Sequence, residues 1–175
     1  ASNKRKDSYG GFIENRLRFV IEVTQKIADA IGADKTGIRI SPYGSFNDME
    51  VFDNIEETYL HLIEKLQSMN LAYLHIAEMA SLSGGPEVPL SFKLKLKSIF
   101  KGAVIRSGGL DKNTAEAALN NNEAELVAFG RSLISNPDLV YRMENDLPIQ
   151  ETDFNTLYTP GEKGYTDYPL ATNTK

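Results

Sequence analysis

The chain has 175 residues, 41% of them hydrophobic and 25% charged, an ordinary balance for a globular domain with its own core. Its net charge is -5 and its basic residues are scattered, which argues against a nucleic-acid partner. The absence of cysteine excludes disulfides, thiolate metal sites and cysteine nucleophiles. Without a bilayer-spanning apolar run or a start resembling a signal peptide, we expect no membrane partner and a cytoplasmic location.

Helical and strand-like patterns alternate along the chain. Apolar residues recur at helical spacing from 13 to 31, and Gly32 follows as a stop signal. Short apolar runs typical of buried strands cover 37–42, 72–76, 103–106 and 126–129. Helical patterns separate or follow these strands, beginning near 53 and covering 91–100, 113–119 and 136–144.

Three of these helices have recognisable start signals. Asp53 with Glu56, and Asn113 with Glu116, have the spacing of a capping box. Asn136 is followed by proline, which favours the first helical position. Beyond these helices, residues 147–175 combine turn-forming residues with several aromatic ones, so we expect an ordered extension that is packed by its aromatic rings.

A leading helix followed by four strand–helix units is typical of an α/β fold with parallel strands and right-handed crossovers. Two architectures fit this order. One is an open doubly wound sheet, and the other is half of a (β/α)8 TIM-type barrel, since a whole barrel has about 250 residues. Periodicity alone does not decide between them.

Two strand-like runs end in glycine and precede helical patterns, at 106–110 and 127–132. In a (β/α)8 barrel, the loops after the last two strands frequently bind a phosphate group, with helix N-termini nearby. Arg131 adds a planar cation suited to a phosphate dianion. Each glycine taken alone is explained as well by a tight turn, but the pair together with Arg131 favours a phosphate site.

The segment 9–19 reads YGGFIENRLRF. It resembles the signature Y-G-G-S-x-E-N-R-x-R-F of the Old Yellow Enzyme family, whose members are FMN-dependent ene reductases. Further similar segments follow in the family's order, at 37–42, 73–75, the two glycine-containing runs, 136–139 and 164–169. The resemblance therefore covers essentially the whole chain.

This resemblance implies that residues 1–175 are the C-terminal half of a barrel, strands five to eight, with 147–175 as its extension. The implied activity is the NADPH- or NADH-dependent reduction of activated C=C bonds in enones, with FMN as cofactor. The family's paired histidines and tyrosine proton donor would lie just before Ala1. We therefore expect a complementing half-barrel chain or self-association, because four open strands leave unpaired edges and an exposed apolar face. The alternative is a non-catalytic half-barrel that binds only FMN or phosphate.

The resemblance also implies roles for particular residues. Arg39 would reach flavin N1 and the C2 carbonyl, whereas the alternative for a charge in an apolar strand is a core ion pair. Tyr158 matches an active-site tyrosine of the substrate pocket, with surface packing as its alternative. The residues implied in cofactor binding at the two glycine-containing ends are Ser107, Gly108, Gly109, Phe129, Gly130 and Arg131.

Three further residues carry expectations. Phe12 replaces the family's serine, so we expect the first helix to lose a side-chain cap and the ring to pack against a neighbour. His75 matches a family histidine, and we expect a hydrogen bond to hold it, whereas His61 is expected to be exposed. Neither histidine stands in a metal-ligand pattern, so we expect no metal.

Overall fold

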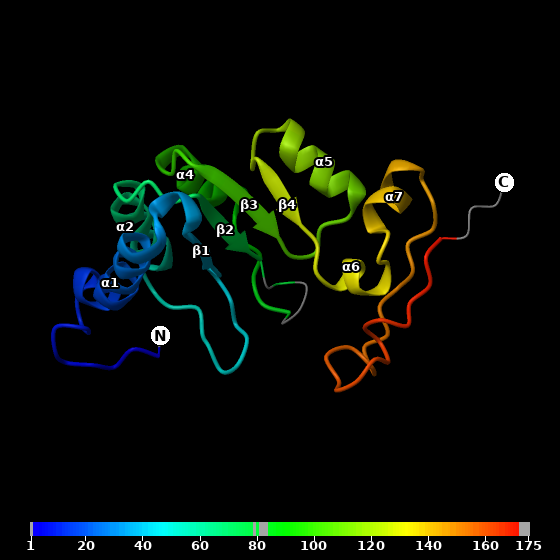
Figure 1. The fold of residues 1–175 in the computed structure, drawn as a ribbon. Coiled ribbons are helices and arrows are strands. Elements are labelled where there is room, and N and C mark those ends of the chain that lie inside the picture. Colours follow the sequence, from blue (N-terminus) through cyan, green and yellow to red (C-terminus); the bar gives the residue numbers. More distant parts are fainter. Residues whose placement is uncertain (1, 79, 81–83, 172–175) are drawn as a thin grey trace. The chain divides into compact units, whose positions relative to one another are not determined.

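The computed structural model describes residues 2–78, 80 and 84–171, which separate into two compact units. The first unit, Ala1–Ala128, contains a parallel sheet and the longer helices. The second, Phe129–Lys175, contains two short helices and the segment that follows them. Figure 1 shows the elements of both units.

The sheet of the first unit has four strands: β1 (Gly37–Ile40), β2 (Tyr73–Ala77), β3 (Ala103–Ser107) and β4 (Leu126–Ala128). All three pairings are parallel, and the spatial order follows the chain order. A doubly wound sheet reverses its strand order at a switch point, whereas a barrel sheet does not. Sequential order therefore confirms the half-barrel architecture.

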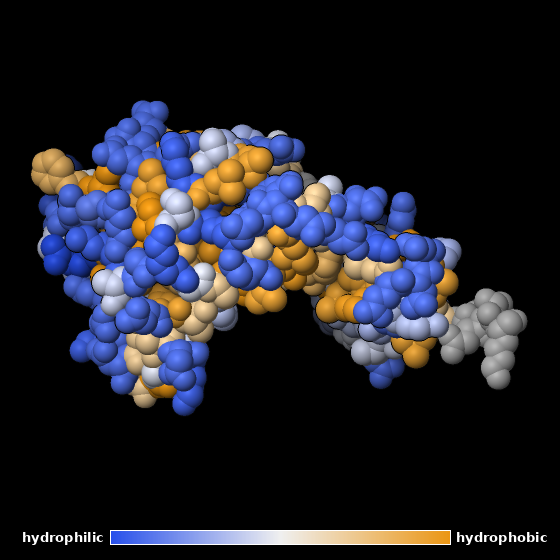
Figure 2. Space-filling model, turned by 90° about the horizontal axis from the view of Figure 1, so that it is seen from above, coloured by the Kyte–Doolittle hydropathy of each residue, from blue (hydrophilic) through white to orange (hydrophobic). Residues whose placement is uncertain are grey.

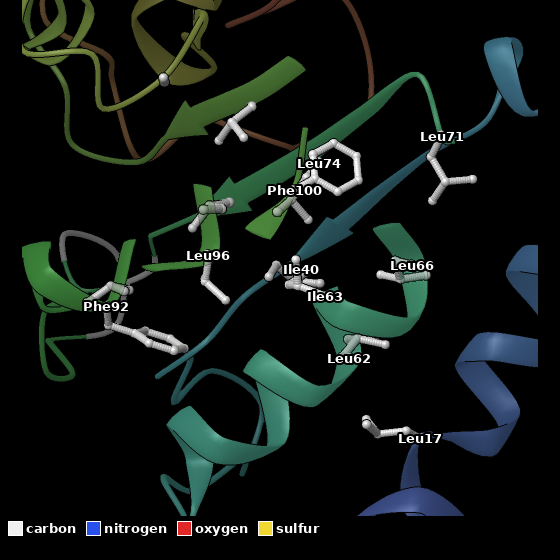
Figure 3. Close-up of a cluster of buried hydrophobic side chains, with 14 of the residues drawn as sticks. Leu17, Ile40, Leu62, Ile63, Leu66, Leu71, Leu74, Phe92, Leu96 and Phe100 are labelled. Carbon is white, nitrogen blue, oxygen red and sulfur yellow. The ribbon is translucent and has the colours of Figure 1, made fainter. Parts of the chain in front are cut away.

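Helices pack on one face of this sheet (Figure 3). The helices of the first unit are α1 (Ile13–Ile31), α2 (Ile55–Gln67), α4 (Leu90–Ile99) and α5 (Lys112–Asn120), with a short 3-10 turn η1 (Ala33–Lys35). The fully buried side chains of the core come from the strands and from α2 and α4: Leu74, Val104, Ile63, Leu66, Phe92 and Leu96.

The two faces of the sheet differ because alternate side chains point to opposite sides. Leu74, Ile76 and Val104 are buried against the helices. The other face, the open face, carries Arg39, His75 and apolar side chains that are less buried than Leu74, apart from the small Ala77 at the end of β2. Those apolar side chains include Tyr73, which is 39% exposed, Ile105, which is half-buried, and Leu126, which is 53% exposed.

Hydrophobic side chains also reach the outer surface among hydrophilic ones (Figure 2). On α1 they recur every fourth residue, which places them on one stripe of the helix. This α1 stripe consists of Phe19, Val23, Ile27 and Ile31, and each of these is at least 40% exposed.

The second unit contains α6 (Arg131–Ser135) and α7 (Leu139–Glu144), and no regular helix or strand in residues 147–171. The extension is nevertheless ordered by hydrogen bonds. The buried Asn136 amide donates to the carbonyl oxygens of Ser132 and Gln150, both at 2.9 Å, and accepts from the Gln150 N–H at 2.8 Å. Phe154 and Tyr158 are about two-thirds exposed, so these two rings are not buried, although Phe154 lies beside Arg131 and Tyr158 beside Tyr165.

The helix α1 has the predicted bounds, and the strand boundaries lie within two residues of the predicted ones. The three predicted start signals are wrong, although α4 and α5 begin within one residue of the predicted 91 and 113. The α2 helix begins after Asn54, which has φ 61° and makes no capping bond. The capping box of α5 joins Asp111 and Thr114. The Asp111 carboxylate accepts from the backbone N–H of Thr114, three residues further along the chain, at 2.8 Å. Asp138 precedes α7, while Asn136 ends α6.

Two expectations for single residues are also wrong. Phe12 is 82% exposed and packs into no buried site, although α1 does begin without a side-chain cap, as expected. His61 is half-buried rather than exposed, because α2 lies between other helices. Its Nε2 atom is buried and has no hydrogen-bond partner among the described residues.

Candidate functional site

The candidate site of the first unit lies at the carboxyl edge of the sheet, where parallel strands bring their last residues together. Arg39 of β1 stands in register with His75 of β2 on the open face. The His75 Nε2 atom is 2.7 Å from the Ser107 Oγ atom at the end of β3. This contact confirms the expected hydrogen bond of His75 and fixes the Ser107 hydroxyl at the edge.

The electrostatics of this edge favour a neutral His75 beside a charged Arg39. Burial lowers the pKa of His75, and the nearby positive charge of Arg39 lowers it further. Arg39 is exposed and makes no ion pair with a carboxylate in the described part of the chain. The alternative of a core ion pair is therefore not what the structure shows.

The turn after β3 needs glycine at Gly108 and has a positive φ at both glycines. The φ angles are 111° at Gly108 and 69° at Gly109. A Cβ atom on Gly108 would lie 1.9 Å from the Glu78 carbonyl oxygen, a backbone atom that cannot rotate away. The Glu78 N–H in turn donates to the Ser107 carbonyl at 2.8 Å. The turn therefore rests directly on the chain that leaves β2.

The end of β4 is the neighbour of this turn, because Ala128 pairs with Ser107. Phe129 and Gly130 follow in the chain and open the second unit. Gly130 has φ -106°, in contrast to the positive φ of Gly108 and Gly109. Within its own unit, no described atom lies within 4 Å of the position that a Cβ would take there, so this backbone is open to approach.

Arg131 begins α6, and its guanidinium carbon lies 5.7 Å from the centre of the Phe154 ring. Arg131 and Phe154 border an open depression of about 480 Å³ in the second unit, together with Ser132, Ile149, Gln150, Glu151 and Thr152. Tyr158 is 65% exposed, with φ 62°, and its ring centre is 6.4 Å from that of Tyr165. The structure therefore groups Arg39, Ser107, Gly108 and Gly109 at one edge and describes Arg131 and Tyr158 within the second unit.

Sequence reasoning missed a buried cluster of charges behind the glycine turn. Arg106 alternates with Ser107 along β3, so its side chain points to the helix-covered side. There it pairs with Glu78 and Glu123, and Lys93 of α4 pairs with Glu78. The signal in the sequence was a charged residue at a position where the strand alternation predicts burial.

In the residues that the structure describes, no group of three or more His, Asp or Glu side chains is arranged to hold a metal ion. The same residues include no helix that is both long and apolar enough to cross a membrane.

Sequential parallel strands, helices on one face and glycine turns at the carboxyl edge define the class of this protein as half of a (β/α)8 barrel. Within that class, the chain belongs to the NADH:flavin oxidoreductase / NADH oxidase family, whose model matches residues 1–150. The cofactors of this family are FMN and a reduced nicotinamide.

Relatives of known name support this assignment. A putative 12-oxophytodienoate reductase from Oryza sativa subsp. japonica is 40% identical over 171 residues, which are 96% of this chain and 46% of that protein. The structure of morphinone reductase superposes with a TM-score of 0.92 and 38% identity, covering 98% of this chain and 46% of that one. An Old Yellow Enzyme homologue from Zymomonas mobilis has a TM-score of 0.89 and 32% identity, covering 97% and 48%.

These comparisons confirm the resemblance to Old Yellow Enzymes, the barrel fold and the family's use of FMN. Morphinone reductase has also been solved in complex with tetrahydroNAD. The chain spans about half the length of the relatives it matches, 46% of the rice protein and of morphinone reductase.

Proposed function

We propose that this chain is the FMN-binding half of an ene reductase that uses NADPH or NADH to reduce the activated C=C bond of α,β-unsaturated carbonyl compounds. One observation carries this proposal. The carboxyl edge of a four-stranded parallel sheet presents Arg39, the His75–Ser107 hydrogen bond and the turn at Gly108 beside the end of β4. Edges of this kind hold the cofactors of (β/α)8 enzymes.

Each residue of the site has a proposed task. Arg39 would reach flavin N1 and the C2 carbonyl, where its positive charge would favour the more negative, reduced form of the cofactor. Contact with the FMN phosphate is the proposed task of Ser107, Gly108 and Gly109 at the end of β3, and the same task is proposed for Phe129, Gly130 and Arg131, which follow β4 in the chain. Tyr158 belongs to the substrate pocket.

The described residues fit this cofactor in three respects. Arg39 is exposed and makes no ion pair with a described carboxylate, so its charge is available to a ligand. The backbone at Gly130 is open, with no described atom of its unit near a Cβ position. Positive φ angles at Gly108 and Gly109 turn the chain sharply just past Ser107, as a close backbone approach to a phosphate requires.

Bound FMN would supply hydride transfer between the nicotinamide and the enone. The protein residues bind the cofactor, orient it and adjust its charge. The chain has two histidines, and they do not form a pair: His75 bonds Ser107 on the open face, while His61 lies on α2 in the helical layer. We therefore propose that the catalytic histidine pair and the proton donor come from residues outside this chain.

A second candidate is a non-catalytic half-barrel that binds FMN or phosphate, self-associates or assembles with a complementing chain. It is favoured by two surfaces that a closed barrel would cover. One is the open sheet face with Tyr73 and Leu126, which are 39% and 53% exposed. The other is the α1 stripe, of which Phe19 is 67% exposed.

The test compares two ligands that differ only in the phosphate. The purified chain should bind FMN more tightly than riboflavin, as measured by fluorescence titration. Arg131→Ala should weaken FMN binding by about tenfold or more, as expected for loss of a charge-assisted contact, and riboflavin binding much less. Arg18→Ala, which removes an exposed arginine of α1, serves as the matched control and should change neither affinity.

Equal losses for both ligands would show that Arg131 acts through general stability, and no loss would remove it from the site. An activity assay then separates the two candidates. A sample whose mass spectrum shows only this chain should not reduce cyclohexenone with NADPH. Robust turnover by that sample would contradict the proposal that the catalytic groups lie elsewhere.

A further inference from the structure

A cluster of four buried charges lies behind the turn at Gly108. Glu78 uses both carboxylate oxygens: Oε1 accepts from Arg106 Nη2 at 2.6 Å and from Arg106 Nε at 3.1 Å, and Oε2 accepts from Lys93 Nζ at 2.8 Å. Arg106 Nη1 donates to Glu123. The four side chains are between 8% and 12% exposed. Two cations and two anions are thus buried together and paired.

The members of this cluster come from four separate places in the first unit. Lys93 belongs to α4 and Arg106 to β3, while Glu78 follows β2 and Glu123 precedes β4. Breaking a buried ion pair is strongly destabilising, because one charge is then left unpaired away from water. The cluster therefore fixes the chain just beyond β2 relative to the strand that carries the glycine turn.

Glu78 connects this cluster to the candidate phosphate turn through its backbone. Its N–H donates to the Ser107 carbonyl, and its carbonyl oxygen occupies the space where Gly108 would carry a Cβ. The backbone of Glu78 therefore lies directly against the turn. The β2 strand ends at Ala77, so Glu78 lies outside it, and the side-chain pairs of Glu78 with Arg106 and Lys93 tie this residue to β3 and α4.

We propose that Arg106, through its fork to Glu78, is a positioning residue that sets the Gly108–Gly109 turn for the phosphate of FMN. This inference rests on the proposed function and adds a residue that does not touch the cofactor. Arg106 faces the helix-covered side of the sheet, opposite to Arg39 and His75. Its effect on the position of the turn passes through the backbone of Glu78.

The test measures discrimination between FMN and riboflavin in the full chain. Arg106→Lys keeps the charge but loses the fork, and we expect the ratio of the FMN to the riboflavin dissociation constant to rise by about tenfold, which is about 1.4 kcal/mol. Glu123→Gln removes the second anchor of Arg106 and should raise the ratio less. Lys97→Met is the matched control, because it breaks another pair of α4, with Glu125, and should leave the ratio unchanged.

The outcomes separate this inference from the proposed function. A wild-type chain that does not distinguish FMN from riboflavin overturns both. A wild type that prefers FMN, with the same ratio in Arg106→Lys, overturns the positioning role alone. Equal loss of both ligands in Arg106→Lys, including loss through unfolding, shows a merely structural role and also overturns it. Faster amide hydrogen exchange at Gly108 and Gly109 in folded, ligand-free Arg106→Lys would support it independently.

Discussion

The two faces of the sheet come from the same strands but have different tasks. On one face Leu74, Ile76 and Val104 are buried and belong to the hydrophobic core that the sheet shares with α2 and α4. On the other face Arg39 and His75 stand at positions that alternate with those residues and remain partly accessible. Because neighbouring residues of a strand face opposite sides, a substitution can change stability without changing the candidate site, or the reverse.

The largest expected effect compares the same substitution on the two faces. Leu74→Ala should lower the free energy of unfolding by about 3 kcal/mol, because Leu74 is fully buried and its loss leaves a cavity. Leu126→Ala should cost less than about 1 kcal/mol, because that side chain is 53% exposed on the open face. Urea denaturation measures both. Equal costs would mean that the open face is covered in solution, as self-association would produce.

The next effect compares the two glycine ends. Gly108→Ala should destabilise the protein by about 1–3 kcal/mol, because φ is 111° and the new Cβ would lie 1.9 Å from a backbone oxygen. Gly130→Ala should stay within about 0.5 kcal/mol, because φ is negative there and no described atom of its unit is near the Cβ position. Thermal unfolding of both variants measures the difference. A tolerated Gly108→Ala would show that the turn moves away from Glu78.

This contrast illustrates what sequence alone could predict. Helix α1 and the four strands were predicted closely, because apolar periodicity is a local property of the sequence. The capping residue of α5 was not predicted, because Asp111 and Asn113 are both good capping residues and only the fold selects one. Both glycine-containing ends look alike in the sequence, but only Gly108 meets another backbone.

The candidate site also has parts that the sequence predicts and parts that it does not. The strand ends at Arg39 and Ser107 follow from motif and alternation, and the hydrogen bond of His75 was expected from the resemblance. The partners of Arg106 could not be predicted, because Glu78 and Glu123 stand far from it in the sequence and meet it only after β2, β3 and β4 have come together. Tertiary ion pairs have no periodic signal.

Arg39 provides a third, smaller comparison, because its effect should fall on the cofactor and not on stability. Arg39→Met keeps a side chain of similar length and removes the charge. In a sample that binds FMN, the flavin reduction potential should fall by about 30 mV or more, equivalent to about 1.4 kcal/mol for a two-electron couple. Unfolding energy should change by less than about 0.5 kcal/mol, since Arg39 is exposed. Potentiometric titration that gives an unchanged potential with FMN bound would remove Arg39 from the flavin.

The smallest effect concerns the pH dependence of the open face. Burial and the charge of Arg39 lower the pKa of His75 in the folded chain below its ordinary value of 6.5. Between the two pKa values the unfolded state binds more protons than the folded state, so stability must fall as the pH drops below the unfolded value. The advantage of the wild type over His75→Gln should therefore shrink between pH 7.5 and pH 5.5.

Urea denaturation of both proteins at the two pH values measures this change, and the subtraction cancels the carboxylates that titrate at lower pH. When both proteins also carry Arg39→Met, the difference between the two pH values should be smaller. This substitution removes the second cause of the lowered pKa of His75 and leaves the burial of its ring. A wild-type advantage that grows on acidification would mean that protonated His75 is stabilised in the fold. The neutral imidazole beside Ser107 would then be the wrong state for this edge of the sheet.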